Sequence, residues 1–252
     1  MHANFHLNPL SKAPPNQHGE SDTYLISSLA TIQLRAWLTS PLYQHIYYAD
    51  SSTHPGIVDS MITRHKNSLL NEPTCHLISL LHCEEPEVGE PWKVIAFIKY
   101  HVFASVEQIE RRTDAGKRQW PEGMHVDMVE DVWTRIAECR HRYGKQLGPH
   151  VDVEILATDP DYQRMGAGRM LLDAVCAQAD RLGLPGYLEG SEEGKKLYES
   201  CEFVGEENIW VDLRRWEDGK DRGKDWRGEG AKEGVGEGWY NQQVMLRPAK
   251  RN

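Results

Sequence analysis

The sequence predicts one α/β domain that spans residues 1–252 and is built on a mixed β-sheet. Segments with strand and helix periodicity follow one another, and they lead to a strand–turn–helix–strand–helix–strand unit between residues 151 and 213. Because further strands precede this unit, we expect a mixed sheet rather than a doubly wound parallel one. The chain has 252 residues, 39% of them hydrophobic, so an ordinary core is possible.

The N-terminal half, residues 1–150, contains strands and amphipathic helices. The expected strands are residues 4–10, 74–82 and 93–103, and the expected helices run from residue 21 to Pro41 and over 42–48, 57–70 and 127–143. Residues 84–91 are polar with Pro and Gly, as a hairpin loop should be. Residues 105–125 are charged and are expected to be irregular.

The helix expected at residues 127–143 has signals at both ends. Asp127 and Glu130 form a capping-box pattern at its start. Gly144 occupies the position expected of a C-cap glycine.

The C-terminal half has the clearest pattern. A strand over 151–158 leads through a turn at 159–161 into the best helix of the sequence, over 163–182. A short strand, a short helix and a long strand follow at 186–189, 192–201 and 203–213. Residues 214–238 are rich in Gly and charge and predict a flexible loop, before a last strand and tail over 239–252.

Composition excludes several classes of protein. The net charge of −9 argues against a nucleic-acid binder, which needs a basic face. We find no signal-peptide pattern and no apolar run long enough to cross a bilayer, so we expect no membrane partner. Five irregularly spaced cysteines predict a reducing, cytoplasmic or nucleocytoplasmic location, and no metal-ligand spacing is present, so we expect no metal.

The turn that opens the best helix suits an anion. The first turn of a helix leaves N–H groups unpaired, and its dipole favours negative charge. Gly166 and Gly168 remove side chains that would block these groups, and Arg164 and Arg169 add positive charge, so a pyrophosphate fits. The alternative is that both glycines serve only close packing. The spacing matches neither the P-loop nor the dinucleotide motif.

These residues resemble the GNAT superfamily of N-acetyltransferases. Gln163-x-x-Gly166-x-Gly168 is similar to its acetyl-CoA signature, and the flanking segments 156–160, 179–189 and 197–203 are similar to the fungal branch. Glu202 departs from the glycine that is usual before Phe203. The resemblance implies a mostly antiparallel, twisted central sheet, flanked by helices and splayed between its fourth and fifth strands.

The resemblance also implies a binding site for acetyl-CoA within a core at residues 151–213. The backbone of Leu156 and Thr158 would pair with the pantetheine amides, and residues 163–169 would hold the pyrophosphate. The implied binding residues are Leu156, Ala157, Thr158, Gln163, Arg164, Met165, Gly166, Ala167, Gly168 and Arg169.

Glu154 and Tyr198 are the catalytic candidates. Strand alternation places Glu154 on the face of Leu156, where the family often has a base, and Asp152 is the reserve candidate. Tyr198 matches the family tyrosine that protonates the departing thiolate. The alternatives are that Glu154 is a solvated carboxylate on an exposed strand face and that Tyr198 is an aromatic side chain packed in the core. His150 is expected at the surface.

The acceptor implied by the resemblance is a primary amine on a small molecule or a peptide. It would enter between residues 36–48 and the helix at 127–143. Aromatic candidates for its cleft are Trp37, Tyr43, Tyr47, Tyr48, Trp120 and Trp133, and the basic residues Arg111, Arg112, Lys117 and Arg118 are expected in a solvated loop. A module that binds acyl-CoA without turnover, and a transferase for a longer acyl group, remain alternatives, and the oligomeric state is open.

Overall fold

The computed structural model describes residues 4–10, 23–47, 52, 54–112, 119–219, 222–223, 233–234 and 236–250. Seven strands form one sheet in the order β1-β2-β3-β4-β5-β7-β6. The strands are β1 (Phe5–Pro9), β2 (Cys75–His82), β3 (Lys93–Phe103), β4 (His150–Thr158), β5 (Gly186–Ser191), β6 (Val204–Asp212) and β7 (Trp239–Arg247). The predicted mixed α/β sheet is confirmed.

The sheet opens between β4 and β5. These two strands are parallel and pair over only three positions, ending where Val153 lies opposite Leu188. The strand pairs on either side of them are antiparallel. From Glu154 onward, β4 therefore has no strand partner on this side among the described residues, which is the predicted splay.

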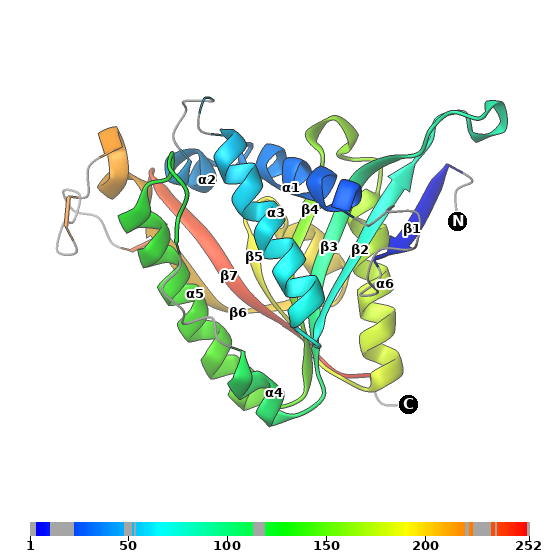
Figure 1. The fold of residues 1–252 in the computed structure, drawn as a ribbon. Coiled ribbons are helices and arrows are strands. Elements are labelled where there is room, and N and C mark those ends of the chain that lie inside the picture. The colour runs from blue at the N-terminus through cyan, green and yellow to red at the C-terminus, as the bar shows by residue number, and fades with distance from the viewer. Residues whose placement is uncertain are drawn as a thin grey trace.

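Helices cover both faces of the sheet (Figure 1). They are α1 (Thr23–Trp37), α2 (Pro41–Ile46), α3 (His54–Asn71), α4 (Val106–Arg111), α5 (Val126–Leu147), α6 (Ala167–Leu182) and α7 (Lys195–Ser200). Helix α6 buries Leu171, Leu172 and Val175 on one face of the sheet. Helices α1, α3 and α5 cover the other face, where they bury residues such as Leu29, Ile57 and Val132. Among the described residues, no helix combines the length and apolar character needed to cross a membrane.

A β-bulge in β4 changes which side chains share a face. Tyr100 pairs with Val153 and Lys99 pairs with Ile155, so Glu154 is the extra residue. Leu156 packs with the α6 core, whereas Glu154 contacts Lys99 on the opposite face. The expectation that Glu154 and Leu156 share a face is therefore wrong, because the bulge interrupts the alternation on which it depended.

The ends of α5 also differ from the prediction. The helix begins at Val126 with His125 as its N-cap, so Asp127 lies inside the first turn and forms no capping box. It continues past Gly144 to Leu147, and Gly148 is the C-cap. Gly144 serves packing instead, since a Cβ there would lie 3.2 Å from Cγ2 of Ile109.

Two segments that were expected to be irregular contain short helices. Helix α4 forms within residues 105–125, and a 3-10 helix (Leu213–Gly219) begins the segment that was expected to be a flexible loop. Most of residues 220–235 lie outside the described part of the chain. Helix α6 begins at Ala167 rather than at Gln163, because a short 3-10 helix (Pro160–Tyr162) and the turn at Gly166 precede it.

The departure at Glu202 has a structural consequence. Glu202 adopts a left-handed backbone conformation with φ 69°, which a glycine adopts without strain. Its carboxylate lies 3.2 Å from Arg247 and 2.8 Å from Lys250. These ion pairs connect the turn before Phe203 to the end of β7 and to the residues that follow it.

Candidate active site

One cleft of 1010 Å³ runs from the start of α6 to the aromatic side chains of α1, α2 and α5. It passes along the open end of β4, so the splay of the sheet forms part of its floor. Of the ten predicted cofactor residues, nine line the cleft; Met165 does not and is exposed. The predicted catalytic residues Glu154 and Tyr198 also line it.

The start of α6 presents unpaired backbone N–H groups to the cleft. Gly166 is the N-cap, with φ 86°, and no side chain caps this end. The first backbone hydrogen bond of the helix joins the N–H of Met170 to the carbonyl of Gly166, at 3.0 Å. The N–H groups of Ala167, Gly168 and Arg169 thus have no helical partner, and the helix dipole favours an anion beside them.

The two glycines of the turn have different structural roles. Gly166 is needed for its left-handed backbone conformation, whereas a Cβ at Gly168 would lie 3.2 Å from Cδ2 of Leu197 and 3.7 Å from Oγ1 of Thr158. Close packing therefore explains in part why a glycine is needed at position 168, and the left-handed backbone conformation explains why one is needed at position 166. Arg164 is also left-handed, at φ 66°, and is exposed.

Arg169 is already engaged within the protein. Its guanidinium contacts Asp173 at 2.7 Å and Ser200 at 3.2 Å, along the outer side of α6. The hydrogen bond to Asp173 raises the pKa of Arg169 and keeps its charge beside the helix start. This charge adds to the positive potential of the helix start.

Tyr198 lies against a surface made by two glycines. A Cβ at Gly194 would lie 2.6 Å from Cε2 of the ring, and one at Gly190 would lie 2.9 Å from Cδ2. Burial raises the pKa of Tyr198 to about 12. Among the described residues its hydroxyl has no hydrogen-bond partner, although it lines the cleft, so it is a protonated phenol free to donate to a ligand.

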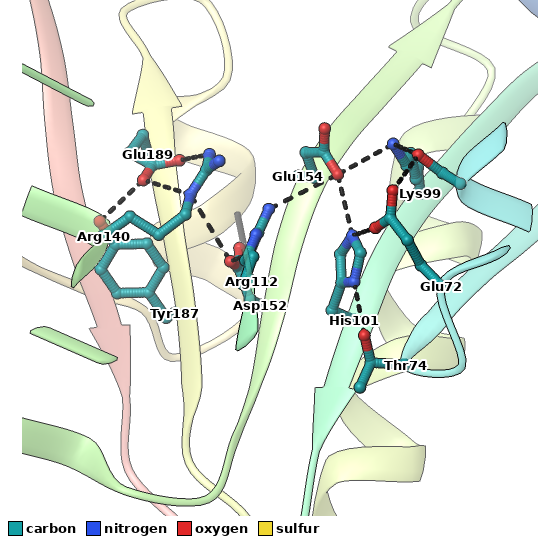
Figure 2. Close-up of polar contacts among 11 residues, drawn as sticks. Glu72, Thr74, Lys99, His101, Arg112, Arg140, Asp152, Glu154, Tyr187 and Glu189 are labelled. Carbon is teal, nitrogen blue, oxygen red and sulfur yellow. Dashed lines mark hydrogen bonds and ion pairs between the residues drawn. The ribbon is translucent and has the colours of Figure 1, made fainter. Parts of the chain in front are cut away.

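Glu154 lies at the centre of a charged network that Figure 2 shows. Its Oε2 lies 3.0 Å from Nζ of Lys99 and 3.0 Å from Nε2 of His101, and 3.6 Å from the Arg112 guanidinium. Burial acts to raise its pKa, but these cationic and donating groups outweigh it and hold the pKa of Glu154 well below its usual range. Glu154 is therefore an anion at neutral pH with a reduced affinity for a proton.

Asp152 is buried beneath the cleft and does not line it. Arg112 donates to its Oδ2, and the Arg140 guanidinium lies 3.6 Å away. Burial opposes the charge of Asp152, but these arginines hold its pKa below the usual value. Its geometry fits a counter-ion that positions two arginines rather than a base that reaches an acceptor.

Arg140 joins this network to β5. It binds Glu189 through two nitrogens, at 3.1 and 2.7 Å, and Tyr187 donates to Glu189 at 2.7 Å. Burial raises the pKa of Glu189, and the nearby Asp152 carboxylate adds to the effect against the attraction of Arg140. The network therefore crosses the gap where β4 and β5 separate (Figure 2).

One arginine and one histidine, Arg112 and His150, lie in places that differ from the prediction. Arg112 was expected in a solvated loop, but it is largely buried against Asp152. His150 was expected at the surface, but it is buried, and burial lowers its pKa. Lys117 and Arg118 lie outside the described residues. Arg112 is the C-cap residue of α4 and reaches Asp152 across 40 residues of sequence, so no local pattern could have revealed its place in the cleft.

Aromatic side chains form the other end of the cleft. Trp37 stacks on Tyr43 with ring centroids 4.3 Å apart, and Trp133 meets Trp37 edge-on at 6.4 Å. Trp120 also lines the cleft, as predicted. Tyr47 packs behind Tyr43 in the core, with its centroid 6.1 Å away. Tyr48 lies outside the described residues.

The sequence profile of the acetyltransferase (GNAT) family matches residues 74–203, which is more than half of the chain. The chain belongs to this family. The matched range contains both the open end of β4 and the start of α6. The protein is thus an acyltransferase, and its family uses acetyl-CoA as the acetyl donor.

Solved structures of this family share the fold. A Corynebacterium glutamicum protein, described as histone acetyltransferase HPA2 and related acetyltransferase, aligns with a TM-score of 0.53 at 13% identity, over 99% of this chain and 98% of its own. A mosquito protein described as an arylalkylamine N-acetyltransferase aligns with a TM-score of 0.56 at 13% identity, over 96% and 86%. At this identity the likeness shows the fold alone. A search of curated proteins finds no match.

Proposed function

We propose that this GNAT protein transfers an acetyl group from acetyl-CoA directly to a primary amine. One observation carries the proposal: the open end of β4, the uncapped start of α6 and the hydroxyl of Tyr198 all line a single cleft. Acetyl-CoA has amides that could pair with β4, a pyrophosphate that could bind at the start of α6, and a thioester that could lie beside Tyr198.

We also propose that residues 1–252 form one domain that works in the cytoplasm, consistent with five buried free cysteines.

The backbone of β4 and α6 would bind the donor. Beyond Val153 the strand has free backbone groups on its β5 side, and Leu156 and Thr158 would pair with the pantetheine amides. The N–H groups of Ala167, Gly168 and Arg169 would bind the pyrophosphate. When bound, acetyl-CoA supplies an acetyl group activated as a thioester.

Tyr198 would act as the general acid. Its raised pKa keeps the phenol protonated at neutral pH, and its hydroxyl is not engaged by another described side chain. A proton donated to the departing sulfur prevents a free thiolate from forming, which speeds expulsion of the leaving group. Because Gly190 and Gly194 have no Cβ, the Tyr198 ring can pack directly against the backbone at these two positions.

The identity of the base stays a prediction. Glu154 lines the cleft as the predicted base, but the ion pairs with Lys99 and Arg112 lower its affinity for a proton. A base works best when its pKa is near the working pH, so this environment weakens Glu154 as a direct proton acceptor. A water molecule that contacts Glu154 is an alternative route for the proton.

The proposal is tested by following the free thiol that is released from acetyl-CoA in the presence of a panel of primary amines. We expect amine-dependent thiol release, and an acetylated amine detected by mass spectrometry. Y198F should retain acetyl-CoA binding while losing most of kcat. A protein that binds acetyl-CoA but releases no thiol with any amine would instead be a binding module.

A further inference from the structure

Glu193 differs from the other carboxylates that line the cleft. Glu154 is paired with Lys99, and Glu189 is paired with Arg140. Glu72 lies 3.8 Å from His101. Glu193 has no ion pair with any described residue, and its side chain is exposed to the cleft. It therefore keeps an uncompensated negative charge at the site.

A chain of hydroxyl groups orients the Glu193 carboxylate. Tyr240 donates a hydrogen bond to Oε2 of Glu193 at 2.8 Å, and Ser40 donates to the Tyr240 hydroxyl at 3.1 Å. Ser40 is buried at the N-cap of α2, and Tyr240 is buried in β7. Both donors are fixed by the core, so they hold Oε2 while Oε1 stays available to a ligand.

The same carboxylate lines the cleft together with the predicted acid and the aromatic side chains. Glu193 immediately precedes Gly194, against which the Tyr198 ring packs. Its charge raises the pKa of both Tyr198 and Tyr43, although burial is the larger cause for each. Tyr43 in turn stacks on Trp37. An amine beside Glu193 would therefore lie near both the aromatic surface and Tyr198.

We propose that Glu193 binds the ammonium group of the acceptor, and that the acceptor is a small primary amine with a flat aromatic body that packs on Trp37 and Tyr43. This inference rests on the proposed function and names the substrate class of the same site. A charge-assisted hydrogen bond to Oε1 holds the cationic nitrogen. Offset or edge-on contact with the stacked rings holds the aromatic body, while the ring faces also attract the ammonium.

The test compares the wild type with E193Q and with the matched control E199Q, which changes an exposed glutamate of α7. The acceptor is 2-phenylethylamine, and acetyl-CoA binding is measured separately by calorimetry. We expect E193Q to raise KM for the amine by about tenfold, because a neutral amide acceptor replaces the charged carboxylate and weakens the hydrogen bond to the ammonium group. Acetyl-CoA affinity should stay within about twofold, and E199Q should match the wild type.

Two further acceptors separate charge from shape. Aniline is neutral at the assay pH, so E193Q should leave its KM unchanged. Butylamine carries the charge without the ring, so the wild type should prefer 2-phenylethylamine in kcat/KM by about tenfold, an effect of the size expected for burying a side chain-sized apolar group.

The outcomes distinguish this inference from the proposed function. If the wild type does not bind acetyl-CoA, the proposed function fails and the inference fails with it. If acetyl-CoA binds and amines are acetylated, an unchanged KM in E193Q overturns the role of Glu193 alone. A preference for butylamine, or for the N-terminus of a dipeptide amide, over 2-phenylethylamine overturns the aromatic substrate class.

Discussion

G194A should misplace the Tyr198 hydroxyl without disturbing the backbone. Gly194 has φ −85° and ψ −19°, which alanine adopts readily, so the effect falls on the ring that the glycine contacts. The added Cβ would lie 2.6 Å from Cε2, 3.0 Å from Cζ and 3.1 Å from the hydroxyl oxygen. Carbon atoms in contact prefer about 3.5–4.0 Å, so the ring must retreat by about 1 Å.

The neighbours of the ring set the size of the effect. Gly190 confines it on another side, where a Cβ would lie 2.9 Å away, and Phe203 packs edge-on at 6.4 Å. Overpacking of this kind costs about 1–3 kcal/mol of stability. A displacement of about 1 Å at a reacting group can cost about a hundredfold in rate, so we expect kcat to fall by roughly 30- to 100-fold.

The assay measures kcat, the acetyl-CoA dissociation constant and the melting temperature of G194A, with G56A as the control. A Cβ at Gly56 meets no atom within 4 Å, so G56A should behave as the wild type. In a Y198F background, G194A should cost little further kcat, because no hydroxyl remains to be misplaced. A kcat for G194A within about twofold of the wild type would refute the assignment of Tyr198.

Three further variants test separate parts of the site. Y198F should lower kcat about a hundredfold, and the wild-type pH–rate profile should show no loss of this acid below about pH 11, because its pKa is raised to about 12. D152N should lower the free energy of unfolding by about 3–5 kcal/mol at neutral pH, since it leaves buried arginines without their counter-ion. Because the pKa of Asp152 is lowered in the folded protein, this difference in stability should persist at all pH values above about 4 and shrink as the pH falls further. Denaturant titrations at several pH values measure it. A difference in the free energy of unfolding below about 1 kcal/mol at neutral pH would contradict the role of Asp152 as a buried counter-ion. G166A should weaken acetyl-CoA binding by about tenfold in calorimetry, because a left-handed conformation costs alanine roughly 1–2 kcal/mol, and unchanged affinity would show that this turn does not need it.

The sequence predicts most of the residues that line the α6 end of the cleft, because the signals there are local. The strand, turn and helix that carry Gly166 lie within about thirty residues, and the turn chemistry is written in neighbouring positions. Trp37 and Tyr43 lie on successive helices, and their place in the cleft was implied by the resemblance to the family.

The charged network could not be predicted, because it depends on contacts between distant strands and helices. Arg112 reaches Asp152 across 40 residues, and Arg140 reaches Glu189 across 49. The bulge at Glu154 depends on the register of β3 against β4, and no residue type in the segment marks it. Strand alternation alone therefore placed Glu154 on the wrong face.

The position of Glu193 could not be predicted either, because it also depends on a contact with a residue that is distant in sequence. Its neighbours in sequence, at 190–194, have the spacing of neither a P-loop nor a Gly-x-Ser-x-Gly elbow. Its place in the cleft depends on Tyr240, which is 47 residues away, and its uncompensated charge is visible only once the partners of the other carboxylates are known.

The most direct test of the central claim is to follow the backbone amide signals of isotopically labelled protein during titration with acetyl-CoA. We expect the amide signals of Ala167, Gly168 and Arg169 to shift together and these amides to exchange more slowly with solvent, along with those at the open end of β4. Acetyl-CoA that binds while these amides stay unchanged, or no binding at all, would contradict it.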